Sequence, residues 1–174
     1  LVENWPWLSA MTVLIACSAF FSGSEAALFS LRWRDRRELS KGGTSQRVAA
    51  HLLSDPDRLL SAVLLWNLAI NMTYFGIASI VGLQLERQLG RSSAGIFFTT
   101  SLLAIIFFSE MLPKSLAVLS ARGISSLVGI PLALCVRLLD PIMPTLRLIS
   151  LLSRRLAWPS FRTEKYLEVS DLER

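Results

Sequence analysis

Long apolar runs broken by short charged segments set the pattern of this chain. Residues 4–24, 59–85 and 92–109 contain no charged side chain. A helix needs about 20 apolar residues to cross the hydrocarbon core of a bilayer. The pattern therefore predicts an all-α integral membrane protein with three transmembrane helices, at about residues 8–31, 59–83 and 93–120.

The apolar segment that follows is shorter. Residues 123–136 are uncharged, but Arg137 and Asp140 come soon after. Placing such charges at the bilayer centre costs about 2.5 to 3.5 kcal/mol each on insertion scales. We therefore predict two juxtamembrane helices along the cytoplasmic face, at about 124–139 and 141–156, broken near Asp140. Residues 1–156 would form one transmembrane domain, and the polar residues 157–174 would be a linker to further domains.

Basic residues indicate the orientation. Between the first two predicted helices the chain carries Arg32, Arg34, Arg36, Arg37, Lys41, Arg47 and Arg58. The next connection has only Arg87 and Arg91. Since cytoplasmic loops hold the excess of Lys and Arg, the N-terminus is expected outside and the C-terminus in the cytoplasm of a multi-pass protein in the plasma (inner) membrane.

The composition of the chain indicates which kind of partner it binds. The chain is 52% hydrophobic and 18% charged, with a net charge of +5. Basic residues in such a protein set orientation and contact anionic lipid, so we expect the lipid bilayer as partner and no nucleic acid. The one histidine, His51, lies in the basic loop, where it is expected to be solvated.

The first predicted helix carries polar residues inside its apolar run. Ser18, Ser22 and Glu25 are spaced i, i+4, i+7 and so share one face. Gly23 weakens the helix locally and exposes a carbonyl. For Ser18 and Ser24 taken singly, we favour a structural role, with the hydroxyl bonded back to its own helix or allowing close helix packing.

Two amides lie one turn apart in the second predicted helix. Asn67 and Asn71 must face protein or water rather than lipid. Hydrogen bonding between helices, worth about 0.6 to 2 kcal/mol, would explain a single asparagine. Two asparagines on one stripe, with carboxylates on other helices, favour a polar cavity.

The third predicted helix carries Glu110, Pro113 and Lys114. Pro113 lacks the N–H that would bond to the Ser109 carbonyl, so the helix should kink there and free an oxygen near Glu110. Glu110 and Lys114 are one turn apart, which makes an internal ion pair the structural alternative.

The donors on these three helices are all oxygen. Serine hydroxyls, asparagine carbonyls, a carboxylate and freed backbone carbonyls suit a hard cation such as Mg²⁺ or Na⁺ rather than zinc or copper. There is no phosphate-binding glycine loop and no nucleophile with a matching base. An enzyme is not expected.

Three motifs occur in order on the successive helices. The runs are Phe-Ser-Gly-Ser-Glu at residues 21–25, Asn-x-x-x-Asn at 67–71 and Glu-x-x-Pro-Lys at 110–114. Together they resemble the transmembrane domain of the CorC/cyclin-M (CNNM) magnesium transporters. The resemblance implies a homodimer, cytoplasmic CBS domains later in the same chain, and Mg²⁺ export driven by Na⁺ entry. ATP would bind only in those CBS domains.

The resemblance also implies roles for residues. Ser22, Asn67 and Glu110 would be the Mg²⁺ ligands. Supporting or Na⁺-linked roles would fall to Gly23, Glu25, Asn71 and Lys114. Two positions depart from the usual family pattern, with Trp66 and Ser109 standing where glycine is common. Trp66 could plug or line the cavity.

Two alternatives remain open at this stage. The chain could be a membrane anchor and dimerisation module that regulates a separate magnesium channel. It could also export other divalent metals such as Co²⁺, because these share the ligand chemistry.

Overall fold

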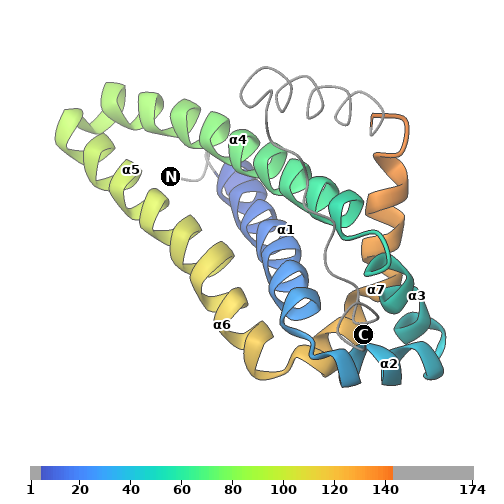
Figure 1. Cartoon of the computed structure of the whole chain (residues 1–174). Coiled ribbons are helices and arrows are strands. Elements are labelled where there is room, and N and C mark those ends of the chain that lie inside the picture. Colours follow the sequence, from blue (N-terminus) through green and yellow to red (C-terminus); the bar gives the residue numbers. More distant parts are fainter. Residues whose placement is uncertain (1–4, 143–174) are drawn as a thin grey trace, which may run out of the picture. The chain divides into compact units, whose positions relative to one another are not determined.

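A computed structural model of the chain describes residues 5–142. These fall into two units, Leu1–Leu139 and Asp140–Arg174, and of the second only residues 140–142 are described. The described part of the first unit consists of helices joined by short connections (Figure 1). Its elements are α1 Trp5–Ser30, α2 Trp33–Lys41, α3 Thr44–Leu52, α4 Pro56–Leu89, α5 Arg91–Ile105, the π-helix η2 Ile106–Met111, α6 Leu112–Leu119 and α7 Ala121–Leu138.

Four stretches of helix are long and apolar enough to cross a membrane. Three of them contain the predicted transmembrane helices, namely α1, α4 and the continuous run α5–η2–α6. The fourth is α7, where a juxtamembrane helix over 124–139 was predicted, so α7 adds a fourth candidate span to the three expected. The helix itself is confirmed, whereas its place along the cytoplasmic face stays a prediction. The second juxtamembrane helix, 141–156, and the linker, 157–174, lie outside the described residues except for 141–142.

Helix α4 begins earlier and ends later than expected. It starts at Pro56, and the Asp55 side chain accepts a hydrogen bond of 3.2 Å from the Arg58 backbone N–H. Proline at the first helical position and a capping aspartate together stabilise this start. At the other end α4 continues to Leu89, and only Gly90, with φ of +87°, separates it from α5. Glycine adopts this left-handed conformation without steric cost, so a one-residue turn suffices.

The basic segment between α1 and α4 is helical rather than a loop. It forms α2 and α3, which contact each other, while α3 packs against α7 (Figure 1). The α3–α7 contact is close, because a Cβ added to Gly129 would collide with the Ser45 carbonyl oxygen and lie 3.2 Å from the Ala49 Cβ. His51 is exposed, as predicted.

Helix α1 packs against α4 along one side and against η2 and α6 along another. In Figure 1 it runs between α4 and the α5–α6 run. A small core of Met11, Tyr74, Ala78 and Ile105 joins α1, α4 and α5. The buried Tyr74 hydroxyl lies 3.0 Å from the Ser101 carbonyl oxygen and 2.8 Å from the Ser101 hydroxyl, so its polar atom is satisfied.

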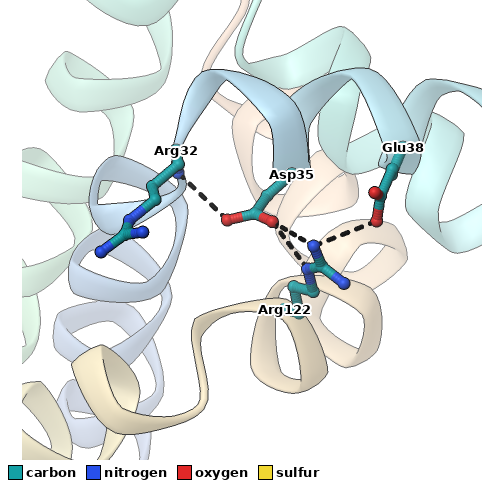
Figure 2. A network of polar contacts seen from close by, with 4 residues as sticks. All are labelled: Arg32, Asp35, Glu38 and Arg122. Carbon is teal, nitrogen blue, oxygen red and sulfur yellow. Dashed lines mark hydrogen bonds and ion pairs between the residues drawn. The ribbon is translucent and has the colours of Figure 1, made fainter.

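An ion-pair network joins α2 to the start of α7 (Figure 2). The Arg122 Nε donates a hydrogen bond of 2.7 Å to Asp35 Oδ1, and a second guanidinium nitrogen contacts the same oxygen. The same guanidinium lies 3.1 Å from Glu38. Asp35 also accepts a 3.3 Å hydrogen bond from the Arg32 backbone N–H, which satisfies a donor at the start of α2.

This network should make the α2–α7 link sensitive to acid. The hydrogen bond with Arg122 holds the pKa of Asp35 below its ordinary value of 3.8. A carboxylate with a lowered pKa stabilises the fold above its unfolded value, and that contribution is lost as pH falls through the folded value. Hydrogen exchange of the α2 amides should therefore speed up below pH 3.8 more in the wild type than in Asp35→Asn.

The matched control is Asp57→Asn, an exposed carboxylate in the first turn of α4. It should respond to acid as the wild type does. Equal acid responses in the wild type and Asp35→Asn would show that the network does not hold α2 to α7.

Candidate functional site

Ser18 in α1 is a polar residue that is fully buried inside the domain. Its hydroxyl lies 2.6 Å from Asn67 Oδ1 and 3.0 Å from Asn71 Oδ1. One hydroxyl on α1 therefore bridges both amides of α4. The hydroxyl has one proton, so the two amide oxygens share it, and each oxygen keeps at least one lone pair with which it can ligate a cation.

This bridge differs from the expectation for Ser18. A serine considered alone in a membrane helix commonly bonds back to its own helix, and Ser24 does so, donating a hydrogen bond of 2.6 Å to the Phe20 carbonyl. Ser18 instead bonds across to α4. The spacing of Ser18, Ser22 and Glu25 predicted that the three residues share one face of α1. The asparagine partners of Ser18 follow only from the packing of α1 on α4.

Helices α1 and α4 run in opposite directions through this region. Met11 packs with Tyr74 and Ala78, whereas Ser18 meets Asn67 and Asn71 further back along α4. Later still on α1, the Phe21 ring stacks on Trp66, with ring centroids 5.9 Å apart and an interplanar angle of 8°. Ser22, next to Phe21, therefore lies near the level of Trp66, about one helical turn past Ser18.

The Ser22 hydroxyl is fully buried and has no hydrogen-bond partner. Ser109 in η2 and Ser125 in α7 are in the same condition. A buried donor left unpaired costs about 1 to 3 kcal/mol, so each of these groups calls for an explanation. Ser109 directly precedes Glu110, and Ser22 lies one helical turn after Ser18, so two of the three unpaired hydroxyls lie close in sequence to other polar residues of the predicted site.

The other side of α1 meets the third span. A Cβ added to Gly23 would lie 3.5 Å from Pro113 Cβ, which is ordinary van der Waals contact. Glu110 comes about one helical turn before Pro113 and is half-buried. The stretch of α1 from Ser18 to Gly23 thus meets the two asparagines of α4 on one side and the proline that follows Glu110 on the other.

The helix around Glu110 departs from α-helical geometry. Residues 106–111 form a π-helix, in which the Leu112 N–H bonds to the Phe107 carbonyl. Pro113 has no N–H to continue this register, so it frees a carbonyl near Glu110. The sequence predicted a kink at Pro113, and the structure places a wider turn immediately before it. Such π-helical turns occur frequently at functional sites.

Other predicted residues are less closely tied to this centre. Glu25 is half-buried and Lys114 is exposed. Among residues 5–142 no ion pair within 4 Å joins Glu110 to Lys114, and no hydrogen bond joins Ser22, Asn67 and Glu110 to one another. Nor does the described part of the chain hold a group of three His, Cys, Asp or Glu residues that could bind a metal. The ligand set stays a prediction.

Trp66 connects this region with α7. Its indole N–H donates a hydrogen bond of 3.0 Å to the Cys135 carbonyl, one of the carbonyls in the last turn of α7. The last four carbonyls of a helix lack partners within the helix, so this bond satisfies one of them. The half-buried Trp66 ring stacks on Phe21 at the end of the polar stretch. Its role as a plug or lining of a cavity stays a prediction.

The sequence of this chain is similar to a known family and to several known proteins. The family described as "Cyclin M transmembrane N-terminal domain" matches residues 10–174. A UPF0053 protein of Haemophilus influenzae is 35% identical over 71% of this chain. The UPF0053 inner membrane protein YfjD of Escherichia coli is 33% identical over 80%. A chloroplastic DUF21 domain-containing protein of Arabidopsis thaliana is 26% identical over 94%. The chain spans only 30%, 31% and 24% of these relatives' own lengths.

Proposed function

Because this chain belongs to the cyclin M transmembrane domain family, we propose that it carries the Mg²⁺ pathway of a transporter that exports Mg²⁺ in exchange for Na⁺. The family is associated with Mg²⁺ transport and is of a transporter type rather than an enzyme type. The chain is also a helical membrane domain with several candidate spans. Na⁺ coupling, stoichiometry and the residues of the site belong to the proposal.

One observation supports the proposal most directly. Within a turn and a half of α1, Ser18 bridges two amide oxygens and Ser22 buries a hydroxyl that has no partner. Gly23 lies beside Pro113, which follows the π-helix that contains Glu110. Polar oxygen in apolar helices is costly unless it is hydrogen-bonded or binds a ligand, and the Ser22 hydroxyl has no hydrogen-bond partner.

The chemistry of these donors fits Mg²⁺ as the transported substrate. In this proposal Ser22, Asn67 and Glu110 each supply one oxygen, and a single carboxylate keeps the affinity modest enough for release. Mg²⁺ prefers six oxygen ligands and gives up water reluctantly, so the remaining positions are filled by water or by a carbonyl freed by Pro113. Gly23 leaves room beside that proline.

Coupling to Na⁺ is assigned to the residues at the edge of this set. Asn71 and Asn67 share the Ser18 hydroxyl, so movement of one amide changes the hydrogen bond of the other. Half-buried Glu25 supplies a second carboxylate on α1, and exposed Lys114 lies one turn after Glu110. We assign these three residues to the Na⁺-linked step.

The whole protein is proposed to be a homodimer in the inner membrane, with the C-terminus of this domain in the cytoplasm. YfjD is by name an inner membrane protein, and its chain is about three times as long as the match. We place cytoplasmic CBS domains, with any ATP site, in that additional length.

Flux through the purified chain in liposomes tests this function. With a fluorescent Mg²⁺ indicator, the chain alone should move Mg²⁺, and an opposing Na⁺ gradient should accelerate it relative to an equal K⁺ gradient. A membrane anchor that regulates another channel would move no ion. Competition with Co²⁺ separates the remaining alternative, since faster transport of Co²⁺ than of Mg²⁺ would make this an exporter of other divalent metals.

A further inference from the structure

Helix α2 carries a stripe of side chains with a different chemistry from the ion pathway. Trp33, Arg36, Arg37 and Ser40 are spaced i, i+3, i+4, i+7, which places them on one face of the helix. The Arg37 guanidinium lies over the Trp33 ring, 5.5 Å from its centroid. Trp33 itself is 74% exposed. A large aromatic ring and two guanidinium groups thus share one face of a nine-residue helix.

The acidic residues of α2 do not neutralise this face. Asp35 and Glu38 lie on another side of the helix, where both pair with Arg122 at the start of α7 (Figure 2). The positive charge of the stripe is therefore left available to an outside anion.

A groove runs between this face and the end of α3. It has a volume of about 500 Å³ and is lined by Trp33, Arg36, Arg37 and Ser40 from α2 and by Leu53 and Ser54 after α3. The Arg36 Nε is buried and has no hydrogen-bond partner. A guanidinium N–H buried without an acceptor is costly, and a phosphate oxygen is the acceptor that arginine binds best.

The position of α2 in the chain favours a lipid headgroup as the source of such a phosphate. Only Leu31 and Arg32 separate α2 from α1, which is long and apolar enough to span the membrane. The three residue steps from Ser30 to Trp33 reach at most about 11 Å, so with α1 as a span α2 begins within the headgroup layer. Tryptophan and arginine are the side chains typical of that layer.

We propose that the groove between α2 and α3 binds the headgroup phosphate of an anionic phospholipid. Arg36 and Arg37 donate hydrogen bonds to the phosphate oxygens, and the exposed Trp33 ring packs against the glycerol and upper acyl region. The site lies on the basic side of the domain and is separate from the proposed ion pathway, so it extends the function rather than restating it.

The test measures binding of phosphatidylglycerol to the full chain in phosphatidylcholine nanodiscs, by native mass spectrometry across a range of lipid fractions. Arg36→Gln with Arg37→Gln should weaken binding at least about tenfold, because each basic residue near the surface contributes about fivefold and the hydrogen bonds add to this. The matched control, Arg87→Gln with Arg91→Gln, removes the same charge from the α4–α5 turn and should leave binding unchanged. Equal losses in both pairs would overturn the proposal.

A conservative variant separates a built site from diffuse attraction. Arg36→Lys keeps the charge but removes the planar guanidinium, so binding should fall several-fold while helix content stays at the wild-type level. Unchanged binding in Arg36→Lys would contradict the groove. Inorganic phosphate at millimolar concentration should not displace the lipid. If it does, the groove is a site for a soluble anion, and the assignment to a lipid headgroup is wrong.

Discussion

Replacing Glu110 with glutamine should lower the Mg²⁺ affinity of the purified chain by about two orders of magnitude and abolish Mg²⁺ flux. The change keeps the size of the side chain and removes the one carboxylate in the proposed ligand set. Removing a group that merely orients a ligand costs 10- to 100-fold in metal affinity, so loss of a direct, charged ligand should reach at least the upper end of that range. Titration of Mg²⁺ by calorimetry gives the affinity, and indicator-loaded liposomes give the flux.

Glu86→Gln is the matched control for this experiment. Glu86 is exposed near the end of α4, so its replacement removes the same charge from the protein without touching the proposed site. Its affinity and flux should equal those of the wild type. Transport by Glu110→Gln at the wild-type rate would remove Glu110 from the pathway.

Replacing Asn67 with alanine should weaken Mg²⁺ binding by at least about tenfold, since one oxygen ligand is lost together with the partner of Ser18. Ser18→Ala leaves both amides in place but removes the hydroxyl that lies 2.6 Å and 3.0 Å from their oxygens. Its effect on affinity should therefore be smaller than that of Asn67→Ala. Each variant should also lose about 1 kcal/mol of stability with the broken hydrogen bond.

The double variant tests the mechanism of this pair. If Ser18 acts by orienting Asn67, then adding Ser18→Ala to Asn67→Ala should cost little further affinity, because the group to be oriented is already absent. Additive losses would mean that Ser18 affects Mg²⁺ independently of Asn67. A normal affinity in Asn67→Ala would exclude this amide as a ligand.

The long helices could be predicted from sequence because membrane-spanning helices are marked by continuous apolar runs. The same signal could not find α2 and α3, which are nine residues each and contain charged or polar side chains at most positions. The predicted span also began too late and ended too early for α4. Arg58, Glu86 and Arg87 interrupt the apolar run, but the helix continues through them. Charges at the ends of a span remain compatible with helix wherever they reach the interface.

The polar positions could also be identified in advance, since oxygen-bearing side chains are rare within apolar runs. Their partners could not. The bridge from Ser18 to both asparagines depends on the antiparallel packing of α1 on α4, and no local pattern indicates it. Likewise Pro113 predicted a disturbed helix, but not that the preceding turn would widen into a π-helix.

We propose that oxygen ligands from three helices converge on one cation between α1, α4 and η2. Anomalous diffraction from crystals of the chain soaked with Mn²⁺, an octahedral substitute for Mg²⁺, tests it directly. We expect a single strong peak enclosed by Ser22, Asn67 and Glu110, which disappears in Glu110→Gln. A peak elsewhere, or side chains of Asn67 and Glu110 that face away from each other in the ion-loaded crystal, would contradict it.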